Sequence, residues 1–207
     1  GRSPVHGEPQ RPPARITMLT SFITALLPVP LVYLIYFRHF RKHYRQESIT
    51  PEYLAHLEAF LCGAALALII ILLAPYINSL FPEPSVVIDA LVKAALVEKL
   101  GTMAVLLFIV RGHGSMRPLD TVICGVMVGV GFSLVENVFY AANFGPSIIL
   151  VRVLFSVPLH LTTSALIAYF LGLWNMGESG AYRAMNIARA AVFPLLIHGV
   201  FDLLLLR

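Results

Sequence analysis

Charged residues are scarce in this sequence: Asp, Glu, Lys and Arg together make up only 13% of its 207 residues. Apolar residues make up 58% and the mean hydropathy is +0.81, so the chain is far more hydrophobic than an ordinary soluble domain. The basic residues stand at the ends of apolar runs instead of forming one continuous stripe, so no nucleic-acid partner is expected despite the net charge of +4. The composition indicates a polytopic membrane protein.

Cysteine is scarce too, and no internal repeat or low-complexity segment is present. Cys62 and Cys124 are the only cysteines, and each lies inside an apolar run. We expect both to be free buried thiols, which say nothing about the redox compartment.

Six apolar stretches are long enough to cross a hydrocarbon core of about 30 Å, which takes about 20 helical residues. We therefore expect an all-α fold, a polytopic transmembrane helical bundle with about six spanning helices. Residues 1–15 are rich in Pro and Gly and have no apolar run, so we expect a disordered tail before a single transmembrane domain at 16–207. The expected spans are residues 16–37, 57–77, 86–110, 119–142, 148–174 and 187–206.

Basic residues that flank the spans predict the orientation. The loop RHFRKHYRQ, residues 38–46, is rich in Arg and Lys and is expected in the cytoplasm. The loops NSLFPEPS, residues 78–85, and NFGPS, residues 143–147, contain no Lys or Arg. We therefore expect both chain termini to lie outside the cytoplasm.

Several ionisable residues lie inside the spans, where each costs about 2.5–3.5 kcal/mol and is a functional candidate. Counting about 1.5 Å per helical residue from one membrane face places Glu98 and His160 about 18 Å deep, His198 about 12 Å, Glu136 about 9 Å and Asp202 about 6 Å. Four helices therefore bring acids and imidazoles into the same half of the bilayer.

Two spacings of four residues put polar side chains on common helix faces. His198 and Asp202 are four apart, which suits a carboxylate that orients an imidazole or helps it bind a metal or a substrate oxygen. Phe132 and Glu136 are also four apart, and Asn137 continues the polar side of that helix.

Three motifs in successive spans resemble those of the PrsW intramembrane proteases, which are related to the CAAX-prenyl protease and bacteriocin-immunity group. The run GVGFSLVENVFY is similar to the FxxxEN segment of that family, RVLFSVPLHLTTSALIAYFLG resembles its next span, and IHGVFD resembles its closing HxxxD. The matching positions are Phe132, Glu136, Asn137, His160, His198 and Asp202.

The resemblance implies a protease-like domain at 16–207 in a bacterial inner membrane. Its expected reaction is hydrolysis of a peptide bond in or near the outer-face end of a single-span membrane protein, by analogy an anti-sigma factor in regulated proteolysis. The first motif departs from the family pattern of two adjacent glutamates followed three residues later by Lys. The stretch VEKLGT has Glu98, Lys99 and Thr102 in those places.

The favoured mechanism uses Glu98 as general base with Glu136 assisting, an assignment that rests on the resemblance. Desolvation at membrane depth disfavours a charged carboxylate and makes it a stronger base than one in water. His198, held by Asp202, or His160 would donate to the developing oxyanion. This mechanism requires no cofactor.

A metal site is the alternative mechanism. His160, His198, Asp202 and the two glutamates provide the ligand types for zinc and a water, although the sequence contains no HExxH motif. Supporting roles for the substrate or the structure are expected for Phe132, Asn137, Arg152 and Lys99.

Simpler interpretations of single residues are also open. His198 and Asp202 would be a structural hydrogen-bonded pair, His160 would bond a carbonyl exposed near Pro158, and Glu136 would join helices. Arg152 would anchor the headgroup region or pair with Glu136.

Two other functions fit the same residues. A small proton- or ion-coupled transporter would line a cavity with such groups, but no inverted repeat is present. A catalytically inactive relative would bind membrane helices without cutting them. The oligomeric state is not predicted.

Overall fold

The structure is a computed structural model that describes residues 53–114 and 116–205. These residues form helices joined by short loops and contain no strand, so the all-α class is confirmed. The expected N-terminal tail, the expected span 16–37 and the loop RHFRKHYRQ lie outside the described residues. The elements are α4 (Tyr53–Leu80), the π-helix η1 (Ile88–Leu96), α5 (Val97–Gly112), α6 (Pro118–Phe144), α7 (Ile148–Leu154), α8 (Ser156–Met176) and α9 (Gly180–Leu205).

Four stretches of the described residues are long and apolar enough to cross a membrane, which is one fewer than the sequence predicts for this part of the chain. The expected span 86–110 is helical, as η1 followed by α5, but four ionisable residues reduce its apolarity. The expected span 86–110 is therefore not confirmed as a membrane-crossing stretch, and the expected span 16–37 is not described by the structure. The four stretches are Tyr53–Leu80, Leu119–Phe144, Ile148–Met176 and Gly180–Leu205.

The expected span 148–174 is also interrupted. It consists of the short helix α7 and the longer α8, separated at Phe155, whose backbone has φ −122° and ψ −58°. The break lets α7 turn its Arg152 side chain into the protein, where that residue is buried.

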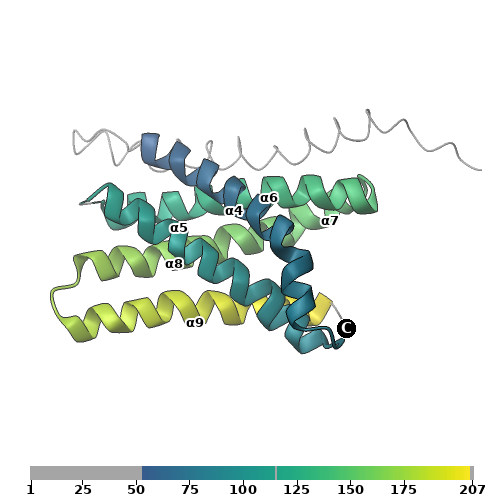
Figure 1. Ribbon diagram of the computed structural model, residues 1–207. Coiled ribbons are helices and arrows are strands. Elements are labelled where there is room, and N and C mark those ends of the chain that lie inside the picture. Colours follow the sequence, from purple (N-terminus) through teal and green to yellow (C-terminus); the bar gives the residue numbers. More distant parts are fainter. Residues whose placement is uncertain (1–52, 115, 206–207) are drawn as a thin grey trace, which may run out of the picture.

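Helix α6 forms the centre of the bundle. It packs between α4 and α8, and α9 packs on α8 and η1, while α4 crosses the others obliquely (Figure 1). Glycines allow the close approach of α4 and α6, because a β-carbon at Gly63 would overlap the carbonyl oxygen of Val128, and one at Gly131 that of Phe60. These contacts hold the peripheral α4 against the bundle.

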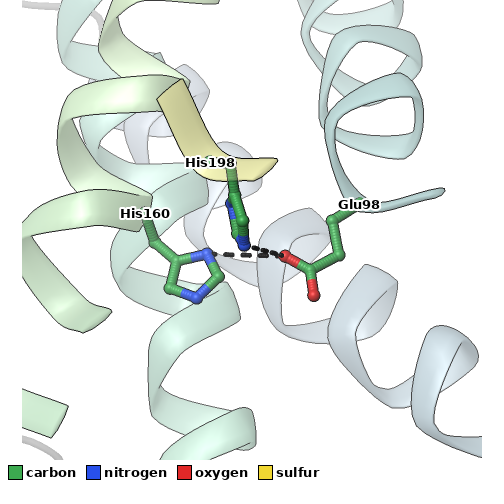
Figure 2. A group of neighbouring side chains, drawn as sticks. All are labelled: Glu98, His160 and His198. Carbon is green, nitrogen blue, oxygen red and sulfur yellow. Dashed lines mark ion pairs between the residues drawn. The ribbon is translucent and has the colours of Figure 1, made fainter. Parts of the chain in front are cut away.

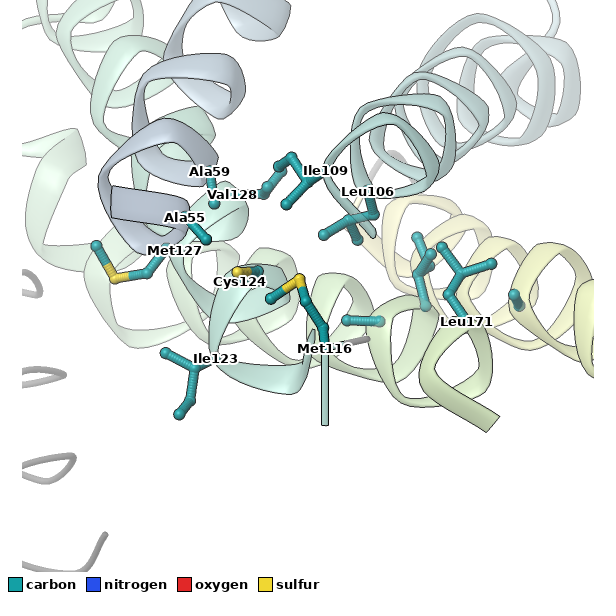
Figure 3. Close-up of a cluster of buried hydrophobic side chains, with 13 residues drawn as sticks. Ala55, Ala59, Leu106, Ile109, Met116, Ile123, Cys124, Met127, Val128 and Leu171 are labelled. Carbon is teal, nitrogen blue, oxygen red and sulfur yellow. The ribbon is translucent and has the colours of Figure 1, made fainter. Parts of the chain in front are cut away.

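The apolar core occupies one half of the bundle (Figure 3). Its members come from the N-terminal halves of α4, α6 and α9, from the C-terminal halves of α5 and α8, and from the loop before α6, which contributes Met116. These parts lie at the same end of the antiparallel helices. Representative side chains are Ala59, Leu106, Val128, Ile167 and Ala190. The opposite half is left for polar side chains.

Cys62 and Cys124 form no disulfide bond among the described residues, as expected. Cys124 is buried in this core, and Cys62 is partly buried on α4.

We predict that Gly131→Ala destabilises the protein by about 1–3 kcal/mol, because the added methyl group overlaps the backbone of α4 at Phe60. Chemical unfolding in detergent micelles measures the change. Gly112→Ala is the matched control, since nothing lies within 4 Å of its added carbon. Equal stability of the two variants would contradict the close α4–α6 contact.

Candidate active site

Five ionisable side chains from four helices meet in the half of the bundle opposite the apolar core. The imidazole rings of His160 and His198 lie 5.2 Å apart, between centroids, and both face Glu98 (Figure 2). The five are Glu98 of α5, Glu136 of α6, His160 of α8, and His198 and Asp202 of α9.

Glu98 faces both imidazoles without bonding to either. Its Oε2 atom lies 3.5 Å from His198 Nε2 and 3.8 Å from His160 Nδ1, too far for good hydrogen bonds. This buried oxygen has no hydrogen-bond partner among the described residues. The other carboxylate oxygen points away from both imidazoles (Figure 2). The Oε2 atom of Glu98 is therefore a buried acceptor that needs a further polar group as its hydrogen-bond partner.

Glu136 is held firmly by two donors. Its Oε2 accepts a hydrogen bond from Arg152 Nη2 at 2.6 Å and one from His160 Nε2 at 2.8 Å. Arg152 Nε also donates to Asn137 Oδ1 at 2.8 Å, and its guanidinium lies over the ring of Tyr140 at 3.8 Å. Because a carboxylate only accepts, the proton of a neutral His160 lies on Nε2, and Nδ1 presents a lone pair toward Glu98.

Asp202 orients the second imidazole in the same manner. Its Oδ2 lies 3.1 Å from His198 Nε2, one helical turn earlier on α9. Nδ1 of His198 has no hydrogen-bond partner among the described residues. With Nε2 between two carboxylates, the proton of a neutral ring is best placed on Nε2.

Lys99 extends the cluster toward α8. Its buried Nζ donates to Thr163 Oγ1 at 3.3 Å and lies 3.8 Å from Glu98 Oε2. The ring of Phe132 packs on His160 at 4.9 Å and lies 5.9 Å from Nζ. Apolar and polar side chains thus enclose the acid–imidazole group.

The structure brings together all the residues that the sequence singled out. The spacing of four between His198 and Asp202 yields the expected contact. Arg152 pairs with Glu136, so its alternative placement at the headgroups is wrong: the side chain is buried and neutralises an acid. His160 bonds Glu136 and no carbonyl near Pro158, because a carboxylate is the stronger acceptor at that position.

One contact residue was missed by the sequence analysis. Thr163 Oγ1 accepts a hydrogen bond from Lys99 and donates one to the carbonyl oxygen of Leu159 at 2.7 Å. The available signal was its spacing of three residues after His160, which places both on one face of α8.

Three of these residues have the properties of metal ligands. Glu98, His160 and His198 each offer one ligand atom, and these atoms lie within 4.8 Å of one another. Two ligands of a tetrahedral zinc lie roughly 3.4 Å apart, which the 3.5 Å and 3.8 Å separations of the Glu98 oxygen approach. Two imidazoles and one carboxylate are also a donor set of catalytic zinc sites.

The surroundings of these donors also favour a cation. The bond from His160 to Glu136 is the kind of carboxylate contact that orients a ligand histidine. Three carboxylates face only two basic side chains, Lys99 and Arg152, so with neutral imidazoles one negative charge stays unbalanced. Binding through His198 Nε2 would shift that ring's proton to its partnerless Nδ1. With that shift, the residues fit a divalent metal.

The apolar helices suit a membrane, and the buried acids and imidazoles suit acid–base or metal-assisted catalysis. Sequence comparison identifies the class of enzyme. The chain belongs to the PrsW family of intramembrane proteases: the model of the family, described as PrsW family intramembrane metalloprotease, matches residues 51–207. The protein is thus an integral membrane protein and an intramembrane protease.

Several curated relatives carry the name Protease PrsW. The protein of Oceanobacillus iheyensis is 26% identical over 163 residues, covering 78% of this chain and 75% of the relative. That of Clostridioides difficile is 28% identical over 198 residues, covering 91% and 80%. That of Shouchella clausii is 28% identical over 153 residues, covering 72% and 69%. No solved structure matches the chain significantly.

We predict that Arg152→Met destabilises the protein by about 3–5 kcal/mol, because Glu136 is left buried without its guanidinium partner. The double variant Arg152→Met/Glu136→Gln should regain part of this loss. Unfolding curves of the four proteins in this double-mutant cycle give the coupling free energy.

Lys93→Met is the control for this cycle. Lys93 pairs with Asp89 at 2.7 Å, but the side chain of Asp89 is 41% exposed. We expect a loss below about 1 kcal/mol for this pair. A coupling energy near zero between Arg152 and Glu136 would contradict the importance of their ion pair.

Proposed function

We propose that this protein is an endopeptidase that hydrolyses a peptide bond in or next to a spanning helix of another membrane protein. The observation that carries the proposal is the partnerless Glu98 oxygen facing two imidazoles inside an apolar bundle. Family membership supports the reaction class, and the burial of these residues supports a membrane-embedded substrate.

The proposed substrate is a single-span protein of the anti-sigma-factor kind, cut near the outer face of a bacterial inner membrane. The distribution of charge supports this orientation. The helix ends next to the apolar core, remote from the cluster, are flanked by Arg111, Arg117 and Arg183. Basic residues that flank membrane helices favour the cytoplasmic side. The acid–imidazole group would then open toward the extracytoplasmic side.

Glu98 is the proposed general base. It takes a proton from a water whose oxygen attacks the carbonyl carbon, and then gives that proton to the amine that leaves when the C–N bond breaks. Such proton transfer contributes about 10²–10⁴-fold to a rate. Glu136 is not the proposed base, because Arg152 and His160 already bind its Oε2. Its proposed role is to orient His160.

We propose a divalent-metal site as the alternative to Glu98 acting as the general base, because the Oε2 atom that would take the proton is also the atom that would bind the ion. Glu98, His160 and His198 would hold it. When bound, such an ion polarises a carbonyl oxygen and acidifies water. The orientation of His160 by Glu136 would serve the site with or without the ion, whereas the hydrogen bond from His198 Nε2 to Asp202 would be lost when that nitrogen binds the ion.

We predict that the unaltered protein in liposomes produces new termini from at least one member of a panel of single-span membrane proteins. Glu98→Gln should lower the cleavage rate at least about 10²-fold, since the amide cannot take the proton. Mass spectrometry of the products identifies the cut. Glu83→Gln is the matched control, since Glu83 is exposed in the loop before η1. Full activity of Glu98→Gln would contradict the assignment of the base.

We predict that the purified protein, stripped with a chelator, binds one zinc ion per chain and gains thermal stability on binding. His198→Gln should abolish both effects because one of the three ligands is lost. The control His113→Gln removes the histidine at the C-cap of α5, which pairs with Glu58 of α4 on the side of the apolar core. Unchanged zinc binding in His198→Gln would place the ion elsewhere, and loss of cleavage after chelation would link the ion to the reaction.

A further inference from the structure

Lys99 brings hydrogen-bond donors into the cluster that the proposed reaction has not used. Its side chain is 2% exposed, and its Nζ contacts Thr163 Oγ1 at 3.3 Å. The hydroxyl of Thr163 donates its hydrogen bond to the carbonyl oxygen of Leu159, so its oxygen accepts the one from Lys99. A lysine ammonium has three N–H groups. Two of them therefore have no acceptor within 3.5 Å among the described residues.

The donors that contact Glu136 and Asp202 are already engaged, whereas the buried Nδ2 of Asn137 has no partner among the described residues and no recorded contact with Glu98. His160 Nε2 donates to Glu136 at 2.8 Å, and His198 Nε2 lies 3.1 Å from Asp202. Arg152 donates to Glu136 and Asn137. In the neutral state neither imidazole has a second N–H to offer. Lys99 is therefore the side chain with free donors next to Glu98.

Hydrolysis of a peptide creates a need for such a donor. Negative charge develops on the carbonyl oxygen as water attacks, and inside an apolar bundle little solvent is present to stabilise it. A donor already in place contributes about 10²–10³-fold to the rate at such a site. Lys99 is held in place by three contacts: the hydrogen bond to Thr163, the ring of Phe132 and the carboxylate of Glu98.

We propose that Lys99 is a catalytic residue that donates from Nζ to the carbonyl oxygen of the scissile peptide while the water activated by Glu98 attacks the carbonyl carbon. The Lys99 proton stays on nitrogen; the leaving amine receives the proton that Glu98 took from water. This inference rests on the proposed peptidase function and replaces the oxyanion role that the sequence assigned to the imidazoles.

The test compares Lys99→Met with the unaltered protein, because Met keeps the length and apolar stem of Lys without its donors. Cleavage kinetics in liposomes are measured together with binding of two Leu/Ala-rich membrane peptides. One contains a phosphinate in place of a single amide and mimics the tetrahedral oxyanion, and the other keeps the amide. Lys93→Met, which changes the exposed pair with Asp89, is the matched control.

The expected result is a fall in kcat of about 10²–10³-fold with KM changed by less than about twofold. Affinity for the phosphinate peptide should fall by a similar factor, and affinity for the amide peptide should not change. Lys99→Arg, which retains donors, should recover part of kcat and of phosphinate affinity. Lys93→Met should match the unaltered protein in all measurements.

A purely structural Lys99 would give a different pattern. Lys99→Met would then lower the unfolding temperature, or weaken both peptides equally, while the folded fraction cleaved at the normal kcat, and this would overturn the proposal. Failure of the unaltered protein to cleave any substrate would contradict the peptidase function instead. The peptide-binding comparison still tests the Lys99 donors in that case, because it requires no turnover.

Discussion

The structure depends on the pairing of buried carboxylates inside an apolar bundle. An isolated charge at this depth is expensive, so each acid needs a partner that accompanies it out of water. Glu136 obtains two partners through one oxygen, Arg152 from α7 and His160 from α8. The break at Phe155 separates these two helices. It therefore affects the site, because the directions of α7 and α8 determine that Arg152 and His160 reach the same oxygen of Glu136.

The pairing gives the two glutamates different roles. The Oε2 atom of Glu136 has two hydrogen-bond partners, whereas the inward oxygen of Glu98 has none among the described residues. An oxygen with partners orients its neighbours, while a partnerless one is available to a proton, a metal or a substrate. Of the two glutamates, Glu136 thus orients its neighbours and Glu98 is the reactive group. The difference arises from the side chains around each carboxylate, since both are glutamates on neighbouring helices.

Much of the site could be predicted from the sequence. Depth counting placed acids and imidazoles in one half of the bilayer because helical rise is regular, and the His198–Asp202 contact followed from a spacing of four. The expected span 86–110 was not confirmed, because the prediction gave more weight to its length and apolar residues than to its four charges, and the break at Phe155 inside the confirmed stretch Ile148–Met176 was not predicted. Arg152 had two open placements, and only its burial distinguished them.

By itself the sequence determined the all-helical membrane class, the family motifs and the set of candidate side chains, because these depend on composition, periodicity and local spacing. Only the tertiary structure decided which acid is neutralised, which imidazole nitrogen faces Glu98, and that Lys99 keeps unused donors. Those properties depend on differences of a few tenths of an ångström in the distances between atoms on different helices. Such distances are set by how closely the helices pack, including at the glycines of α4 and α6, and no local pattern along the chain encodes them.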